Sequence, residues 1–175
     1  MSLNINPTTA ITLAVWVKLS ATGGHQFLVN KFYGLYSNGP NDDSYSMNIT
    51  PSRNLGFQVE TISNGRLKDN ILVTAPVDVY DGKYHFIAGV YDGLSMKLYY
   101  DGREVTNIVR SPGTVSGVIQ ASVNTPLLIG AGSKRGKEAW FVKGLLDEVN
   151  IYNVALSESQ ILDLYNAHTK GICKS

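Results

Sequence analysis

The sequence lacks the features that define several large protein classes. Its single cysteine, Cys173, can form no disulfide within the chain, so a packed core has to hold the fold. No run of apolar residues reaches the ~18 that a membrane-spanning helix needs. The 15 lysines and arginines nearly balance the 14 aspartates and glutamates, which is not the basic surplus of a nucleic-acid-binding protein. We therefore expect no membrane span and no nucleic-acid partner.

The composition describes a folded domain rich in β-structure. With 175 residues, 43% hydrophobic and 17% charged, the chain is long enough for one core and too apolar to be disordered. Its 10 tyrosines and 17 glycines suit strands joined by tight turns. Residues 1–7 lack the basic and apolar regions of a signal peptide. Either the protein is made without one, or residues 1–175 are one domain of a larger secreted chain.

Strand patterns dominate the chain. Residues 11–19 alternate, with Leu13 and Val15 on one face and Ala14 and Trp16 on the other, so we expect a central strand with both faces covered. Further strands are expected near residues 25–29, 45–49, 55–59, 84–90, 96–99, 126–130 and 141–152. The glycine-rich, charged segment 132–138 between the last two is interpreted as a polar loop.

Three Tyr-Asp-Gly triplets begin at Tyr80, Tyr91 and Tyr100. Asp-Gly between alternating segments favours type I′ hairpins, because both central residues of that turn need a positive φ. The triplets therefore predict an antiparallel meander, with the tyrosines packed around its hairpins.

One helix is expected, beginning at Ser157. Ser157 and Gln160 form a Ser-x-x-Gln capping box, and an apolar stripe follows at Ile161, Leu164, Tyr165 and His168. Many short strands with a single late helix, and no strand–helix–strand alternation, predict an all-β fold. We expect a two-sheet antiparallel sandwich with one short C-terminal helix.

Five segments resemble, in order, the laminin-G-like domains of the concanavalin A-like lectin/glucanase superfamily, which also contains the pentraxins. The segments are 11–17 (Thr-x-x-x-Trp-Val), 81–88 (with Tyr84 where tryptophan is usual), 91–102, 126–130 (Pro-Leu-x-Ile-Gly) and 144–157 (Leu-Asp-Glu-Val-x-Ile-Tyr-Asn). The resemblance is strongest over residues 11–166. The resemblance implies a jelly-roll sandwich. Such domains usually open with a further strand, and this sequence starts after the motif of that strand. We expect its place to be either empty or filled by residues 3–7.

Asp147 is the candidate metal ligand. Strict alternation would place it with Leu145, Val149 and Ile151 on one face, as the only carboxylate there. A carboxylate in apolar surroundings must be paired, hydrogen-bonded or bound to a metal. In glucanases of the superfamily an aspartate in a similar last strand holds a structural Ca²⁺, so the resemblance implies Ca²⁺ at Asp147. The alternative is that Asp147 accepts backbone N–H groups at a strand end.

Catalytic motifs are missing. Retaining glycosidases need two carboxylates about 5–5.5 Å apart, and the superfamily's glucanases place theirs two residues apart along one strand. No predicted strand has that spacing, and the adjacent Asp147 and Glu148 would point to opposite faces. No His-Glu-x-x-His, Gly-x-Ser-x-Gly or Walker pattern occurs either. We therefore predict that the protein is not an enzyme.

Loops supply the candidate ligand-binding residues. Sugars are bound by stacking on aromatic rings and by polar groups that reach the hydroxyls. The residues that could do this are Tyr33, Tyr36, Asn41, Asp42, Arg135 and Trp140, and the alternative for each, which the sequence favours, is ordinary surface.

The function expected from the resemblance is binding rather than catalysis. We predict a non-catalytic carbohydrate-binding module that recognises a glycan or polysaccharide and belongs to a larger extracellular, cell-surface or virion protein. The alternative is a protein–protein adhesion or structural module with the same fold. The third hypothesis is a degenerate glycosidase-like domain. Fold alone does not decide among them.

Overall fold

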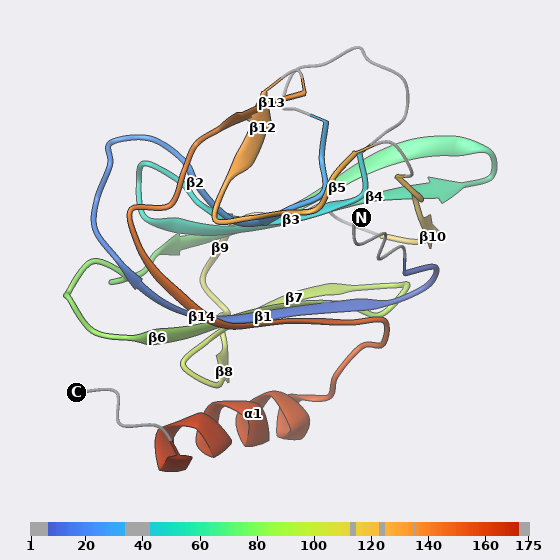
Figure 1. Ribbon diagram of the computed structural model, residues 1–175. Coiled ribbons are helices and arrows are strands. Elements are labelled where there is room, and N and C mark those ends of the chain that lie inside the picture. Colours follow the sequence, from blue (N-terminus) through green and yellow to red (C-terminus); the bar gives the residue numbers. More distant parts are fainter. Residues whose placement is uncertain (1–6, 34–42, 113–114, 123–124, 135, 172–175) are drawn as a thin grey trace.

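A computed structural model describes residues 7–33, 43–112, 115–122, 125–134 and 136–171. Within this part of the chain, two antiparallel sheets stack face to face and one helix lies against the outside of one of them (Figure 1). The predicted all-β, jelly-roll-like sandwich with a single C-terminal helix is confirmed.

The five-stranded sheet has the order β14-β1-β6-β7-β8. Its strands are β1 (Ile11–Leu19), β6 (His85–Tyr91), β7 (Met96–Tyr100), β8 (Arg103–Glu104) and β14 (Gly144–Tyr152). As expected, β1 lies in the interior of the sheet, paired with β14 on one side and β6 on the other.

The seven-stranded sheet has the order β11-β2-β3-β4-β5-β9, with β10 paired to β4. Its strands are β2 (Gln26–Asn30), β3 (Tyr45–Ile49), β4 (Asn54–Ser63), β5 (Arg66–Pro76), β9 (Ile108–Arg110), β10 (Val118–Ile119) and β11 (Leu128–Ile129). A separate hairpin, β12 (Gly132–Lys134) with β13 (Lys137–Ala139), occupies the segment that the sequence suggested was a loop. That interpretation was wrong, because the glycine and charged residues sit in and around a tight turn between two short strands.

The main core fills the space between the sheets. Alternate residues of each strand point inward, among them Leu13, Val15, Phe57 and Ile87, all fully buried. Each such side chain contributes about 1.5–3 kcal/mol relative to an exposed position. This core needs no disulfide.

A second apolar cluster covers the outer face of the five-stranded sheet. Helix α1 (Glu158–Gly171) lies there, and its buried Ile161 packs with Trp16 and Phe86. The ring of Tyr165 stacks on Trp16 at a centroid distance of 5.5 Å. The capping box forms as predicted: Ser157 N donates to Gln160 Oε1 at 2.8 Å, and Gln160 N donates to Ser157 Oγ at 3.3 Å.

Only one Tyr-Asp-Gly triplet makes a two-residue hairpin. Asp101 and Gly102 have φ values of 49° and 77° and join β7 to β8. The triplet at Tyr91 opens a four-residue connection, and the one at Tyr80 lies where the chain crosses from the seven-stranded sheet to the five-stranded sheet. Gly102 also faces the ring of Tyr165, so this turn touches the helix.

A β-bulge interrupts β14. Ala14 lies opposite Asn150 while Trp16 lies opposite Asp147, so three residues of β14 span two of β1. Glu148 takes the strained position, with a φ of 49°, and Asn150 Nδ2 donates to its carbonyl at 2.8 Å. The bulge exchanges the two faces of the strand: Leu146, Val149 and Ile151 pack on the main core, whereas Leu145 is 55% exposed.

Candidate functional site

A groove of about 220 Å³ runs over the outer face of the seven-stranded sheet. Most of its lining comes from outward-facing residues of neighbouring strands, because a sheet presents alternate side chains to one side, whereas the side chain of Phe57 points into the main core. The lining residues are His25, Phe27, Asn48, Thr50, Gly56, Phe57, Gln58, Ile71, Val73 and Arg110. Polar groups therefore surround an apolar floor, and no aspartate or glutamate is among these residues.

Asn48 and His25 form a fixed pair in the groove. Asn48 Nδ2 donates to His25 Nδ1 at 3.0 Å, which leaves the ring proton on Nε2. Burial lowers the pKa of His25, so the ring is neutral at neutral pH. The side chain of Asn48 lies over Gly56, where a Cβ atom would collide with Asn48 Oδ1. Glycine at position 56 thus lets the amide lie flat on the floor.

Acidic residues continue the same face beyond the groove. Gln58 Nε2 donates to Asp69 Oδ1 at 2.7 Å, and Glu60 lies directly opposite Asp69 on the neighbouring strand. Burial raises the pKa of Glu60 to about 7, with further contributions from the charges of Asp43 and Asp69. A search for paired carboxylates along single strands misses Glu60 and Asp69, because they face each other across two strands.

Arg110 lies at the β9 side of the groove, next to Val73 of β5. Its side chain is exposed, and no carboxylate of the described residues lies within ion-pair distance of it.

Most polar residues of the groove were not predicted from the sequence as ligand contacts. The signal that could have found them is the alternation of polar and buried residues along β3 and β4, for example Asn48 between Met47 and Ile49.

The β12–β13 hairpin stands out from the seven-stranded sheet near β2 and β3 (Figure 1). Trp140, which follows it, packs against Phe27 with ring centroids 5.7 Å apart, and Phe27 itself lines the groove. The predicted contact Trp140 therefore supports one wall of the groove. Its φ of 51° shows that the chain holds a strained backbone to place this ring.

Tyr33 lies against the tip of the same hairpin, with 37% of its surface exposed. Its carbonyl accepts hydrogen bonds from Ser133 Oγ at 2.7 Å and Gly136 N at 2.9 Å. Its backbone N donates to Asp43 Oδ1 at 2.6 Å. Four other predicted contacts lie outside the described residues: Tyr36, Asn41, Asp42 and Arg135.

Asp147 lies on the outer face of the five-stranded sheet, opposite Trp16, rather than among core-facing residues. Leu145 shares that face as expected, whereas the expected grouping with Val149 and Ile151 is wrong because the bulge at Glu148 shifts the alternation. Within the described residues, no group of three histidine, cysteine or acidic side chains could hold a metal ion. The calcium prediction therefore depends on main-chain oxygens around Asp147, and it stays a prediction.

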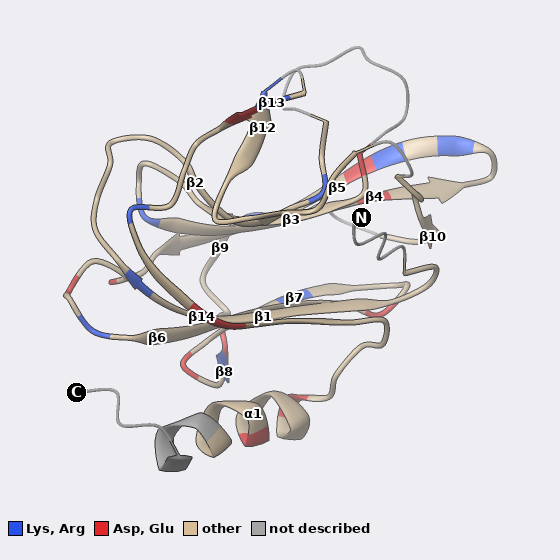
Figure 2. Cartoon of the chain, viewed as in Figure 1, with Lys and Arg blue, Asp and Glu red and all other residues tan. Residues whose placement is uncertain are grey.

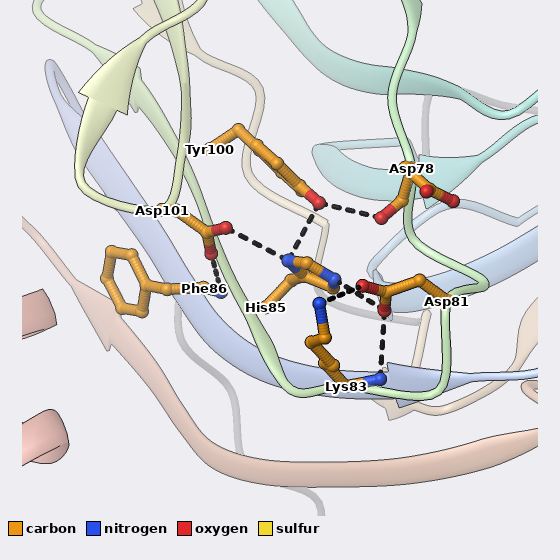
Figure 3. Close-up of polar contacts among 7 residues, drawn as sticks. All are labelled: Asp78, Asp81, Lys83, His85, Phe86, Tyr100 and Asp101. Atoms are coloured by element: carbon orange, nitrogen blue, oxygen red, sulfur yellow. Dashed lines mark hydrogen bonds and ion pairs between the residues drawn. The ribbon is translucent and has the colours of Figure 1, made fainter.

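A second polar cluster surrounds His85 where the chain enters β6 (Figure 3). His85 Nε2 lies 3.0 Å from Asp81 Oδ1, and Nδ1 lies 2.9 Å from Asp101 Oδ2. The ring of Tyr100 stacks on the imidazole at 5.0 Å, and its hydroxyl donates to the carbonyl of Asp78 at 2.7 Å. Two of the Tyr-Asp-Gly triplets thus meet at one histidine.

The cluster holds an imidazole between two carboxylates, an arrangement that favours its protonated form. Burial alone would lower the pKa of His85, but its hydrogen bonds to Asp101 and Asp81 outweigh burial and raise it. The hydrogen bonds from His85 and from the backbone N of Lys83 lower the pKa of Asp81 to about 2. With both ring nitrogens occupied, His85 ties the crossing segment to the β7–β8 turn and has no free position for catalysis.

Comparisons with known proteins agree with this architecture. A family model of laminin-G type, described as the concanavalin A-like lectin/glucanases superfamily, matches residues 2–162. A search among curated proteins found no match to the chain. None of the described helices is long and apolar enough to cross a membrane.

Several solved structures share the fold. The carbohydrate-binding module CBM40 of the Ruminococcus gnavus IT-sialidase, bound to α2,3-sialyllactose, has a TM-score of 0.61 and 15% identity over 90% of this chain and 83% of that one. A SAP-like pentraxin from Limulus polyphemus has a TM-score of 0.59 and 15% identity over 94% and 73%. The leech intramolecular trans-sialidase has a TM-score of 0.60 and 17% identity over 93% and 25%.

Proposed function

Because the chain belongs to the concanavalin A-like lectin/glucanase superfamily, we propose that it is a carbohydrate-binding module whose glycan lies in the groove of the seven-stranded sheet. The observation that carries the proposal is the lining of that groove. Asn48, Gln58 and the His25 Nε2–H can reach sugar hydroxyls, while Ile71 and Val73 offer an apolar floor for the face of a sugar ring. The similar fold of a module bound to sialyllactose supports the same function.

The proposed role is binding without hydrolysis. Cleavage of a glycosidic bond needs an acid and a second carboxylate on either side of the bond. The groove has no acidic lining residue among those described, and Asp69 is engaged by Gln58. We place this module outside the cell, on a surface or on a virion, within a larger protein, because that is where most glycans are met. A protein partner is the alternative if no glycan binds.

Asn48→Ala tests the location of the site. We expect at least a tenfold loss of glycan affinity, because the variant removes the central amide and frees His25 Nδ1. Binding is measured by calorimetry with the best ligand from a glycan array. The matched control is Asn153→Ala, an exposed asparagine that does not line the groove, and it should leave affinity unchanged.

Melting temperatures keep the test interpretable. If Asn48→Ala melts within a few degrees of the unmodified protein and still binds as tightly, the groove is not the site. A broad array that yields no ligand for the unmodified protein contradicts glycan binding itself and favours a protein partner. Release of sugar from a bound polysaccharide would instead show that the protein is an enzyme.

A further inference from the structure

Arg110 has no acidic or aromatic side chain as a partner among the described residues, unlike several other cations of the chain. Lys83 pairs with Asp81, Lys97 pairs with Glu104, and the guanidinium of Arg53 lies 5.6 Å from the ring centroid of Tyr80. Arg110 makes none of these interactions and lines the groove. A guanidinium that lines a binding groove and pairs with no carboxylate of its own chain can donate hydrogen bonds to an anionic group of a ligand.

The surroundings of Arg110 strengthen such an interaction. Val73 and Ile71 form the nearby apolar floor, and an ion pair over apolar surface is less screened than one in open water. The other nitrogen-bearing side chains of the groove, those of His25, Asn48 and Gln58, are neutral. Arg110 is therefore the source of charge selectivity among the lining residues.

The opposite charge lies at the other end of this face. Asp69 and Glu60 continue the row of outward side chains beyond Gln58, and Asp43 is close enough to affect Glu60. The outer part of the β4–β5 hairpin carries charges of both signs (Figure 2). Within the groove, an anionic group is repelled by Asp69 and Glu60 next to Gln58 and attracted by Arg110, so its preferred position is at the Arg110 side.

Resting on the proposed glycan-binding function, we propose that the groove selects acidic sugars and holds their carboxylate on the guanidinium of Arg110. The neutral remainder of the glycan then extends over Ile71 towards Asn48 and Gln58. A sialic acid and a uronic acid carry the same carboxylate, so either can supply this group.

The experiment compares four probes on the unmodified protein and on two variants. The probes are lactose, 3′-sialyllactose, a uronic-acid disaccharide and sulfated lactose. We expect one or both carboxylate sugars to bind at least tenfold more tightly than lactose. We expect sulfated lactose to gain less, because a sulfate ester is a weaker hydrogen-bond acceptor than a carboxylate, although it too can bind a guanidinium through two oxygens. The comparison of 3′-sialyllactose with the uronic-acid disaccharide shows which of the two sugars supplies the carboxylate.

Arg110→Gln should remove this preference, so that the variant binds the acidic sugars no more tightly than it binds lactose. Arg110→Lys should restore part of it, because an ammonium keeps the charge but loses the fork of donors. The matched control is Arg103→Gln, which removes an equal charge from exposed β8 on the other sheet and should leave the preference intact. Raising the salt concentration should lower the affinity for the acidic sugars and leave the affinity for lactose unchanged.

The possible failures separate cleanly. If the groove binds lactose and the acidic sugars equally and Arg110→Gln changes neither, selection of acidic sugars is wrong while glycan binding stands. If Arg103→Gln weakens acidic sugars as much as Arg110→Gln, the attraction belongs to the overall charge and the assignment to Arg110 is overturned. If no probe and no array glycan binds, the proposed function fails, and this inference fails with it.

Discussion

The two outer faces of the sandwich have opposite characters. On the five-stranded sheet, Trp16 and Phe86 are buried under α1, so that face is closed by aromatic packing. On the seven-stranded sheet, Asn48 and Gln58 remain open to a groove. Both sheets give their inner faces to one core, so the outer faces are where they can differ. The comparison indicates that one face contributes stability and the other is free for recognition.

Trp16→Ala gives the largest expected effect and tests the closed face. Removing a buried tryptophan from under the helix should cost about 3–5 kcal/mol of unfolding free energy. Urea unfolding followed by far-UV circular dichroism measures the loss. Glycan affinity of the protein that stays folded should be unchanged, and a parallel loss of affinity would show that the two faces are coupled.

His85→Gln tests the polar cluster at the crossing between the sheets. The raised pKa of His85 means that its contribution is complete below the ordinary value of 6.5 and is lost as pH rises through the folded-state pKa. The variant should therefore be less stable than the unmodified protein by about 2 kcal/mol at pH 5.5, and the gap should narrow by pH 8.5. Melting temperatures at the two pH values check this. An equal difference between variant and unmodified protein at both pH values would contradict a contribution that depends on protonation of His85.

Glu60→Gln tests whether the open face carries an electrostatic cost. A carboxyl whose pKa is raised to about 7 destabilises the fold increasingly as pH rises from its ordinary range, and the cost is complete above about 7. The variant should gain about 1–2 kcal/mol at pH 8, after allowance for partial exposure, and gain nothing at pH 4. The control is Glu138→Gln on exposed β13, which should gain at neither pH.

Calcium removal has the smallest expected effect. With an affinity of ~10⁻⁴–10⁻³ M, typical of extracellular modules, 1 mM Ca²⁺ would stabilise the fold by about 0.4–1.4 kcal/mol. Chelation with EDTA should then lower the melting temperature by a few degrees, and Asp147→Asn should abolish the difference. Identical melting curves with and without EDTA would contradict the calcium prediction.

The sequence predicted the closed face better than the open one. The alternation of residues 11–19, the capping box at Ser157 and the stripe through Ile161 and Tyr165 are local patterns, and each is present in the structure. Packing under the helix needs only apolar residues at the right period. That is why the sandwich, its central strand and its helix could be predicted from local sequence.

The groove depends on relations between strands that no local pattern shows. Asn48 meets His25 across 23 residues of chain, and Arg110 reaches the site from a three-residue strand. The bulge in β14 also escaped prediction, because nothing in the residues Asp147 and Glu148 signals a positive φ. Register and bulges decide which polar residues share a face, and they are set by tertiary pairing.

The position of α1 has a practical consequence for binding measurements. The helix and the β12–β13 hairpin lie on opposite sides of the sandwich (Figure 1), and Leu162 of α1 is 42% exposed. A Leu162→Cys variant could be coupled to a sensor surface through that thiol, with Cys173 replaced by serine. The molecule would then stand with its groove facing the solution, whereas coupling through the lysines of β12 and β13 would bury that side against the support.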